Sequence, residues 1–495
     1  MLRRGLGIVA SWIVLAAMQA PASLLPAPVN GDFSEVVAGS PVGWAVNRRN
    51  GSDPGLILAA GDGIARISPG TAVPGQWARL IQRIDAAPWR GKVVRLSARI
   101  RVASAGDHVG LRLNVVREGG RAGFYEQMND APLAEGDWRA VAITGVVDED
   151  ATAIEIGAML GGRAAIEIDD VRFEELPPTE APMAPEARAY LDRAIEFIRT
   201  THMDSAAQDW PAIIARAHLQ AGGAATPRDT WPAIRGVLGT MGDNHNFLRP
   251  PLPPTSPSGG AAAARPQPLP TYALLDGRFG LVALPGLSML SEAERPHAQA
   301  YVQRLRMALL SFDRSPLCGW IVDLRGNRGG NMWPMLNGLT PLLGAPPFGA
   351  FVGHGSRANW VLRDGVATVE NVSPRQLGLD IRGFALRQAD APVAVLIGPA
   401  TGSSGEAVAI AFAGRPKSRS FGRRSAGYTS ANMTLDLPDG AVLGVPASWE
   451  ADRTGREYRE AIEPDQATHE AEDLVAARNW LSTQCRPGTG SGRNE

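Results

Sequence analysis

The stretch Val393-Ala-Val-Leu-Ile-Gly-Pro-Ala-Thr-Gly-Ser-Ser-Gly-Glu-Ala-Val-Ala-Ile-Ala-Phe-Ala-Gly414 decides the fold of the second half of this chain. It opens with five apolar residues, 393–397, whose length and β-branched content predict a strand buried on both faces. Glycine and proline then break the pattern, and an Ala-rich segment that predicts a helix starts at about Ser404. Ser403 stands at this strand-to-helix corner, where free N–H groups and the positive end of the helix dipole favour a developing negative charge. The corner therefore suits a nucleophile with an oxyanion site beside it.

The same serine has a structural interpretation. Ser403-x-x-Glu406 has the spacing of a capping box, in which the serine caps the helix and the glutamate reaches back to it. Taken alone, the stretch favours the cap over the nucleophile. Other parts of the chain must decide between them.

Composition limits the class of protein. The chain has 495 residues, 44% of them hydrophobic, which is enough for two to four domains. Its formal charge is −1, and no basic block is present, so we expect no nucleic-acid partner. Lysine occurs only at Lys92 and Lys417. This scarcity restricts the choice of a catalytic base.

The N-terminus has the pattern of an export signal. Arg3 and Arg4 precede an apolar run over residues 6–18, and Ala20-Pro-Ala22 resembles a cleavage site. The run is shorter than the about 20 apolar residues of a membrane span. We therefore expect a signal peptide over residues 1–22, a periplasmic or secreted mature protein, and no stable membrane span once the signal is removed. An uncleaved anchor is the alternative.

The chain has two cysteines, Cys318 and Cys485. In an oxidising compartment they can pair and pin the C-terminal tail to the start of a core strand. Two separate buried thiols remain an equally good interpretation. A C-x-x-C redox or zinc site is excluded by the count, and we expect neither a metal nor another cofactor.

Residues 28–176 read as an all-β domain. Short runs that alternate apolar and polar residues are separated by Gly, Pro, Asp and Asn at regular intervals, which predicts a two-sheet sandwich. Through Asn30-Gly-Asp-Phe33, Pro41-x-Gly-Trp44, Gly136-Asp-Trp138 and Ile168-Asp-Asp-Val-Arg-Phe173, the segment resembles carbohydrate-binding modules and galactose-binding-like jelly rolls. Four tryptophans offer surfaces for stacking on a glycan, although such residues more often belong to a core: Trp44, Trp77, Trp89 and Trp138.

The remainder divides into four parts. We expect a small helical unit over residues 184–249, a Pro/Gly/Ala-rich linker over 250–270, an α/β domain over 271–484 and a flexible tail over 485–495. Within the α/β domain, strands at 279–284, 320–324 and 393–397 alternate with helices at 292–310 and 332–343. A β-rich piece over 433–449 and a last helix over 470–481 complete it. The expected fold class is therefore multidomain: a β-sandwich, a helical unit and an α/β domain.

Besides Ser403, two polar clusters stand at element ends. Asp323-Leu-Arg-Gly-Asn-Arg-Gly-Gly330 follows a buried strand, and its glycines allow backbone N–H groups to approach a ligand closely. A tight turn in which Arg325 pairs with an acid explains this cluster equally well. His245 ends the helical unit and can act as a general base near neutral pH, although a lone histidine is more often structural.

Taken together, the clusters resemble a known family, the C-terminal-processing or tail-specific serine peptidases, and within it the branch of the tricorn core and the nisin-resistance-type peptidases. The likeness covers about residues 186–482. Eight motifs carry it in order: Asp209-Trp210 with Asp229-Thr-Trp-Pro-Ala-Ile-Arg235, Gly242-Asp-Asn-His245, Asp323 to Gly330, Thr401-Gly-Ser-Ser-Gly-Glu406, Gly422-Arg-Arg-Ser-Ala-Gly-Tyr-Thr429, Leu437-Pro-Asp-Gly440, Ala451-Asp-Arg-Thr-Gly455 and Ile462-Glu-Pro-Asp465.

The resemblance implies a crotonase-like α/β core with Ser403 as nucleophile. Many relatives use a lysine 25 residues after the nucleophile as base, a position that Tyr428 takes here. In the branch without that lysine a histidine takes the base role, and its motif matches His245. The oxyanion would then be held by backbone N–H groups of Ser404 and of Gly329 or Gly330. The resemblance also implies an acid that orients the histidine, with Glu460 and Glu463 as candidates.

Three features depart from the family pattern, one of them Asn246 in the histidine motif, where relatives often carry Ser. No PDZ-like segment separates the helical unit from the core, and that segment is the family's usual device for capturing a substrate C-terminus. The N-terminal sandwich is an addition to the family's common core. The resemblance thus implies an exported serine endopeptidase that acts on peptides or unfolded protein tails. The alternatives are a non-catalytic binding protein on a degenerate peptidase scaffold and, less well supported, a carbohydrate-active enzyme with paired carboxylates.

Overall fold

The computed structural model describes residues 24–48, 56–71, 77–120, 122–128, 131–177, 179, 181–243, 245–251, 267–288, 294–314, 317–373 and 383–485. The expected signal peptide over 1–22, most of the expected linker over 250–270 and the tail beyond Cys485 lie outside these residues. Asn244, next to the expected base, also lies outside them.

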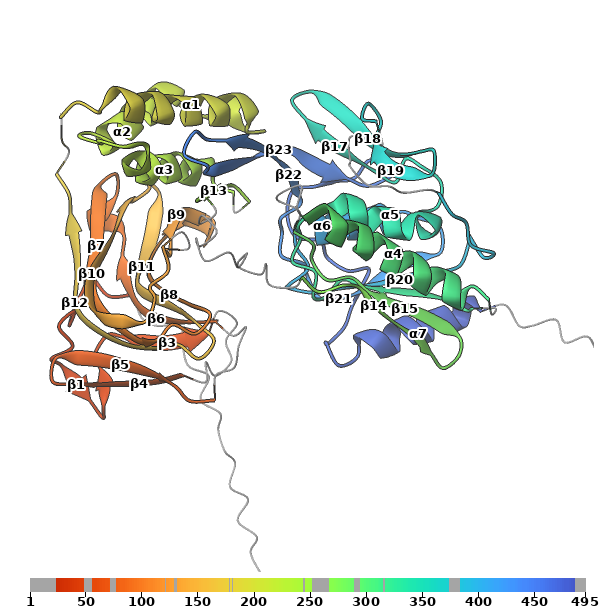
Figure 1. Ribbon diagram of the computed structural model, residues 1–495, viewed down its shortest axis with the longest axis horizontal. Helices are drawn as coiled ribbons and strands as arrows, with labels where there is room; N and C mark the ends of the chain where they lie inside the picture. Colours follow the sequence, from red (N-terminus) through yellow and green to blue (C-terminus); the bar gives the residue numbers. More distant parts are fainter. Residues whose placement is uncertain are drawn as a thin grey trace, which may run out of the picture. The chain divides into compact units, whose positions relative to one another are not determined.

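The chain forms two compact units, labelled by element in Figure 1. The first unit comprises residues 1–191 and 212–243, and the second comprises residues 192–211 and 244–495. The protein is therefore multidomain, as the sequence predicts, and mostly β.

The first unit is built on two five-stranded antiparallel sheets with orders β10-β7-β12-β5-β4 and β3-β6-β11-β8-β9. The strands are β3 (Ala45–Arg48), β4 (Leu56–Gly61), β5 (Ile64–Pro69), β6 (Trp77–Asp85), β7 (Val93–Ser104), β8 (His108–Arg117), β9 (Ala122–Glu126), β10 (Gly136–Val146), β11 (Ala151–Gly161) and β12 (Ala165–Glu175). A short pair, β1 (Val36–Val37) and β2 (Ser40–Pro41), lies outside them. Both sheets contribute alternate residues to one hydrophobic core, for example Leu96 and Ile100 from β7 and Leu111 and Leu113 from β8.

The tryptophans of this unit have different surroundings. Trp44 is buried, and its indole N–H donates to the carbonyl of Asn30. Trp89 packs on the core, with its ring 4.7 Å from that of Phe173. Trp44 and Trp89 therefore serve the core, which was the structural interpretation of these residues. Trp77 and Trp138 are only half-buried.

The helical unit expected over residues 184–249 is divided between the two compact units. Its helices are α1 (Pro185–Thr201), α2 (Trp210–Gln220) and α3 (Trp231–Met241), and α3 lies at one end of the two sheets (Figure 1). Arg117 of β8 donates to the α3 carbonyls of Gly239 and Thr240, and Arg235 of α3 pairs with Glu126 of β9 at 2.6 Å. These contacts make α3 part of the first unit, an outcome that helical periodicity alone cannot predict.

The second unit contains a six-stranded sheet with order β14-β15-β16-β20-β21-β25. Its strands are β14 (Thr271–Leu275), β15 (Phe279–Ala283), β16 (Gly319–Asp323), β20 (Val393–Ile397), β21 (Ser418–Gly422) and β25 (Gln466–Ala467). From β15 to β25 all neighbours are parallel. Every residue of β20 is buried, because helices cover both faces of the sheet.

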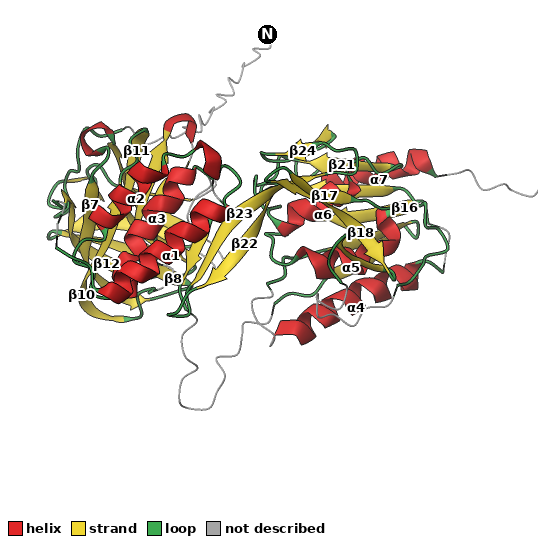
Figure 2. Ribbon diagram, turned by 90° about the horizontal axis from the view of Figure 1, so that it is seen from above, coloured by secondary structure: helices red, strands yellow, loops and turns green. Residues whose placement is uncertain are grey.

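Three helices cover one face of this sheet and one covers the other. Residues of α4 (Arg295–Phe312), α5 (Met332–Leu343) and α6 (Ser404–Phe412) share a core with Val322 and Val395. Residues of α7 (Asp473–Gln484) pack with Ile321 and Leu396 on the opposite face. Figure 2 shows α4 and α7 on opposite sides of these strands. The sequence predicted this alternation of strands and helices, with α5 at its observed bounds.

A second sheet of this unit has the order β13-β23-β17-β18-β19, and both β22 and β24 also pair with β23. Its strands are β13 (Phe247–Arg249), β17 (Gly349–Gly353), β18 (Ser356–Arg363), β19 (Val366–Val369), β22 (Ser430–Asp436), β23 (Val442–Ala451) and β24 (Glu457–Tyr458). Sequence analysis placed a β-rich piece at 433–449 but gave no structure to residues 344–392, which contain β17, β18 and β19. β17 and β19 have only five and four residues, and β18 has a single buried residue, so their alternation is weak.

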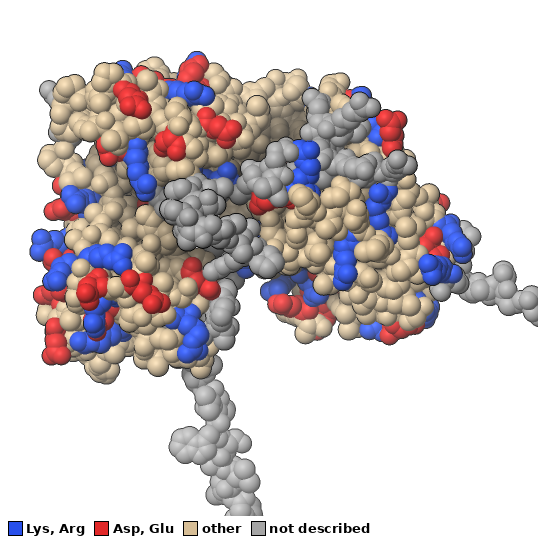
Figure 3. Space-filling model, viewed as in Figure 1, with Lys and Arg blue, Asp and Glu red and all other residues tan. Residues whose placement is uncertain are grey.

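Acidic and basic side chains alternate over the surface. On the face drawn in Figure 3, Lys and Arg are interspersed with Asp and Glu on both units. Among the residues with described positions, no helix is long and apolar enough to cross a membrane.

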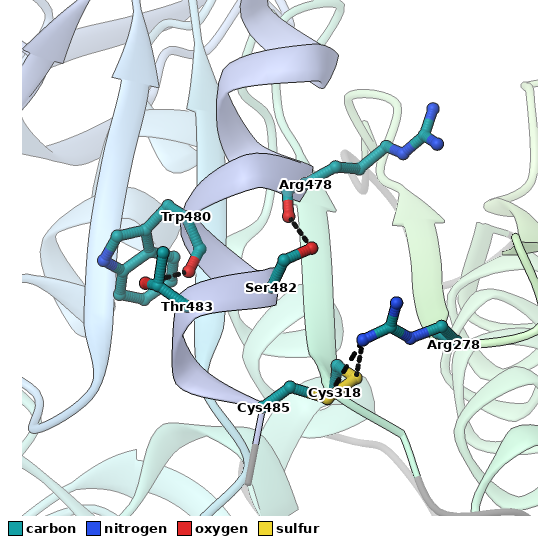
Figure 4. Close-up of a disulfide and its surroundings, with 7 residues drawn as sticks. All are labelled: Arg278, Cys318, Arg478, Trp480, Ser482, Thr483 and Cys485. Carbon is teal, nitrogen blue, oxygen red and sulfur yellow. Dashed lines mark hydrogen bonds between the residues drawn. A yellow bond between two sulfur atoms is a disulfide. The ribbon is translucent and has the colours of Figure 1, made fainter. Parts of the chain in front are cut away.

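A disulfide joins Cys318, which directly precedes β16, to Cys485 at the C-terminal end of α7. Arg278 directs its guanidinium at both sulfurs, as Figure 4 shows. Of the two interpretations of the cysteines, the structure confirms pairing. The bridge closes a span of 167 residues and fixes α7 against the central sheet.

This disulfide leads to a stability prediction. A cross-link over so long a span restricts the unfolded chain, so Cys485→Ser should lower the free energy of unfolding of the second unit by about 2–4 kcal/mol. Thermal unfolding without reductant measures this as a lower Tm. A reductant should bring the wild-type Tm down to that of the variant and leave the variant unchanged. An equal effect of reductant on both proteins would contradict the prediction.

Candidate active site

Ser403 ends the turn between β20 and α6 in a rare backbone conformation. Its φ is 51° and its ψ is −122°, and α6 begins at the next residue. A positive φ at a residue other than glycine is uncommon, and a conformation in a sparsely populated region costs about 1–3 kcal/mol. Such a turn persists only when the surrounding contacts fix it.

Glu406 supplies several of those contacts. Its buried carboxylate accepts hydrogen bonds from the backbone N–H of Ser403 and Tyr428, both at 2.8 Å, through one oxygen. The other oxygen accepts from the N–H of Gly427 and the hydroxyl of Ser425. The glutamate half of the expected capping box is therefore present, and the same carboxylate also fixes the 425–428 segment.

His245 approaches the serine from the second sheet. It lies two residues before β13, which pairs with β23, and Asn432 of β22 donates to its carbonyl at 2.8 Å. Its ring Nε2 is 3.0 Å from the Oγ of Ser403. Its Nδ1 is 2.8 Å from the Oγ of Ser430, a buried residue at the start of β22. The structure thus brings Ser403 and His245 within hydrogen-bond reach, in a row that ends at Ser430.

Tyr428 stands at the position where many resembling peptidases have a lysine. Its ring centre is 5.4 Å from that of His245, at an interplanar angle of 35°. A Cβ added at Gly402 would lie 3.1 Å from the tyrosine ring. The aromatic ring therefore packs between the turn of the serine and the histidine.

The glycine motif after β16 faces the serine directly. A Cβ added to Gly329, which has φ +102°, would lie 2.7 Å from Ser403 Cβ and 3.2 Å from its Oγ. Asn327, fully buried, joins the two loops: its carbonyl accepts from Gly402 N–H and its side chain accepts from Gly329 N–H at 3.0 Å. The N–H of Gly329 is thus already used inside the loop.

Two other N–H groups have no recorded acceptor among the described residues, those of Gly330 and of Ser404 at the first turn of α6. The hydroxyl of Ser404 donates to the carbonyl of Gly330 at 2.7 Å, which holds these two residues together.

The proposed orienting acids lie elsewhere. Glu460 and Glu463 both pair with Arg424, at 3.2 and 3.3 Å, and their side chains are 81% and 66% exposed. The Nδ1 of His245 is occupied by Ser430 instead. The expectation of a glutamate there came from the family resemblance, which gave no information on the direction of the side chains.

Arg325 confirms the structural interpretation of the same glycine motif. It pairs with Asp323 at 2.7 Å and with the buried Asp473 of α7 at 3.2 Å. The motif therefore combines a structural ion pair at its start with the close approach of Gly329 at its end.

A second buried carboxyl group lies on β23. Glu450 is 3% exposed, and its Oε2 has no hydrogen-bond partner among the residues that the structure describes. Burial, together with repulsion from Glu406, raises the pKa of Glu450 well above its usual value. Glu406 accepts four hydrogen bonds, which lower its pKa against the larger effect of burial, whereas this oxygen of Glu450 accepts none.

Comparison with known families bears on this geometry. The model of the family described as "Peptidase family S41" matches residues 278–468. The chain carries a peptidase family S41 domain. That domain includes Ser403 and the glycine motif, whereas His245 lies before its first matched residue.

Several known proteins are similar to this chain. The nisin-resistance protein of Lactococcus lactis subsp. lactis is 38% identical over 176 residues, which are 34% of this chain and 51% of that protein. The chain thus matches about half the length of this curated relative. A lipoprotein from Streptococcus agalactiae shares the fold, with a TM-score of 0.51 and 24% identity over 63% of this chain and all of the other. The photosystem II D1 C-terminal processing protease has a TM-score of 0.41 and 14% identity, over 58% of this chain and 94% of its own.

Sequence reasoning missed three residues of this site. Ser430 and Glu450 lie on strands whose polar residues give no signal of which face they occupy, and Glu406 was assigned only a cap. In the part of the chain with described side chains, no group of three or more His, Cys, Asp or Glu residues is placed to hold a metal ion.

The buried carboxyl pair predicts a pH effect on stability. An unfolded glutamate has a pKa of about 4.3. The pKa of Glu450 is raised in the folded protein, so at pH values above the unfolded pKa the folded protein binds more protons than the unfolded chain. The free energy of unfolding therefore falls as the pH rises. Glu450→Gln removes this loss of stability. The Tm of the variant minus the Tm of wild type should therefore be higher at pH 8 than at pH 4.5, by about 2 °C or more.

Thermal unfolding across this pH range measures the difference, with Glu460→Gln on the exposed surface as the control. A Tm difference for Glu450→Gln that stays constant with pH would exclude a buried proton on this residue.

Proposed function

We propose that this protein is an exported serine endopeptidase that cleaves peptides or unfolded protein tails through an acyl-enzyme on Ser403. The S41 domain supports serine peptidase chemistry as a class. The observation that carries the proposal is the 3.0 Å contact between Ser403 Oγ and His245 Nε2 at a strained strand-to-helix turn.

The first half of the reaction follows from this contact. With its proton on Nδ1, His245 donates to Ser430 and accepts the hydroxyl proton of Ser403 at Nε2. The Oγ of Ser403 then forms a bond to the scissile carbonyl carbon, whose C=O electron pair moves to the oxygen. Protonated His245 next gives its Nε2 proton to the leaving amine, and the C–N bond breaks. Water repeats these steps on the acyl-enzyme and releases the acid.

The negative oxygen of the intermediate requires hydrogen-bond donors beside Ser403. The N–H groups of Ser404 and Gly330 are the better pair, because Gly329 donates its N–H to Asn327. Gly329 then serves by its lack of a side chain, which leaves space at the nucleophile. One donor of this kind is worth about 10²-fold in rate.

Ser430 takes the place of the acid of a serine-protease triad. A neutral hydroxyl holds the ring tautomer and orientation but stabilises the imidazolium less than a carboxylate does. Ser430 is therefore a positioning residue in this mechanism.

The remaining features of the proposal rest on the sequence. The N-terminal signal pattern supports export to the periplasm or beyond, and the lipoprotein and nisin-resistance relatives agree with a place at the cell envelope. A glycan at the first unit would use Trp77 or Trp138, the two tryptophans that are only half-buried. We assign the α/β part to the crotonase-like class and the first unit to the jelly-roll class.

Ser403→Ala tests the nucleophile. This variant should lose labelling by a fluorophosphonate and at least about 10³-fold in peptide cleavage, because removal of the nucleophile disables the triad as a unit. Ser311→Ala, at an exposed serine of α4, is the matched control and should retain both. If Ser403→Ala cleaves at the wild-type rate, the proposal fails. If wild type neither labels nor cleaves, the scaffold is a binding protein.

Ser430→Ala tests the positioning role. We expect a loss of about tenfold in kcat with little change in KM, since general base catalysis depends on ring orientation. The pH–rate profile should also shift, because the hydrogen bond at Nδ1 affects the basicity of the ring. Ser430→Thr retains the hydroxyl and should restore the profile. An unshifted profile in Ser430→Ala would reduce Ser430 to a packing residue.

A further inference from the structure

A groove of about 380 Å³ lies on the second sheet, outside the residues assigned to the reaction. Its lining includes Met203, Val352, His354, Arg357, Trp449 and Arg459. These residues come from β17 and β18, from β23, from the segment after β24 and from the loop that follows α1. All of them belong to the second unit.

Hydrogen bonds hold the walls of the groove in place. His354 and Gly355 form the two-residue turn between β17 and β18, both with positive φ, as tight hairpins of this type require. The ring Nε2 of His354 contacts the carbonyl of Thr201 at 3.0 Å. On the other side, the N–H of Met203 donates to the carbonyl of Pro446 on β23 at 3.0 Å. The groove is therefore preformed.

The groove is joined to the candidate active site through the register of the strands. Val352 of β17 and Ser430 of β22 both stand opposite Trp449 of β23. Directly opposed residues on neighbouring strands share a face of the sheet. Val352, Trp449 and Ser430 thus form one row, and the last of them contacts the imidazole of His245. The groove begins one strand spacing, about 5 Å, from the residue that positions the base.

The chemistry of the groove favours a neutral side chain. Its floor consists of Met203, Val352 and Trp449, all half-buried. The rim carries both signs of charge: Arg459 pairs with Glu457 at 2.9 Å and lies over the ring of Trp449. Arg357 and Asp204 add one charge of each sign, so the four charged residues of the lining cancel. An indole face and a thioether favour an aromatic partner.

We propose that this groove is a specificity subsite that binds an aromatic side chain of the peptide being cleaved. The proposal rests on the peptidase function above and adds a substrate class to it. The far wall of the groove lies two strand spacings, about 10 Å, from β22, and an extended peptide rises about 3.3 Å per residue. The imidazole of His245 lies between Ser430 and Ser403. The aromatic residue of a bound peptide would therefore lie within about five residues of the bond that is cleaved.

Cleavage of matched peptides by the full chain tests this subsite. Two sets of fluorogenic peptides are compared. Each peptide of the first set carries Phe at one of the five positions on either side of the cleaved bond, and its partner in the second set carries Gly at that position. Wild type should prefer Phe at one position by about 10- to 100-fold in kcat/KM, the factor expected from burying one such side chain. Trp449→Ala should lose this preference and cleave the Phe and Gly peptides at similar rates. Trp449→Phe should restore the preference, and Leu310→Ala, an exposed apolar residue of α4, should leave it unchanged.

A binding measurement separates this inference from the peptidase function. Fluorescence anisotropy of the labelled Phe peptide with Ser403→Ala reports the groove without catalysis, and Ser403→Ala/Trp449→Ala should bind it about tenfold or more weakly. Binding that depends on Trp449 without any turnover in wild type would leave the groove intact and overturn the peptidase function. Turnover in wild type with equal rates on Phe and Gly peptides would overturn the groove alone.

Discussion

The carboxylate of Glu406 is the contact on which the candidate site depends. Through one oxygen it accepts the N–H groups of Ser403 and Tyr428, and so joins the start of α6 to the segment that leads into β22. The serine is held at φ 51°, a conformation that its own side chain disfavours. Burial raises the pKa of this carboxyl group, and its four hydrogen-bond donors only partly offset that rise. One buried acid therefore fixes both the turn of Ser403 and the segment that leads into β22.

The two sheets of the second unit have different tasks in this arrangement. The parallel sheet presents Ser403 and the glycine motif at the carboxyl ends of β20 and β16, where the turns of an α/β fold meet. The second sheet supplies the proposed base and its support, because β13 and β22 both pair with β23 and bring His245 beside Ser430. The Nδ1 of His245 and the Oγ of Ser430, which are 185 positions apart in the chain, thus lie 2.8 Å from each other.

Sequence reasoning was most successful where the physical signal is local. The apolar run of β20, the glycines at the corner and the periodicity of α5 each predict their own element, and the motif order placed Ser403 and His245 on their elements. It failed where the outcome depends on packing: Glu460 lies in the region where the resemblance implies an orienting acid, yet its side chain lies in solvent beside Arg424. The attachment of α3 to the first unit and the strands β17 to β19 depend on contacts that no local pattern encodes.

The position of the proposed base fits the absence of a lysine at position 428. Tyr428 occupies the place of the lysine found in many resembling peptidases, and its ring lies against both Gly402 and His245. In the proposed mechanism the proton acceptor therefore comes from position 245 instead of position 428. With the histidine there, an aromatic residue fills the remaining volume and limits the motion of the ring, while Ser430 fixes its far nitrogen.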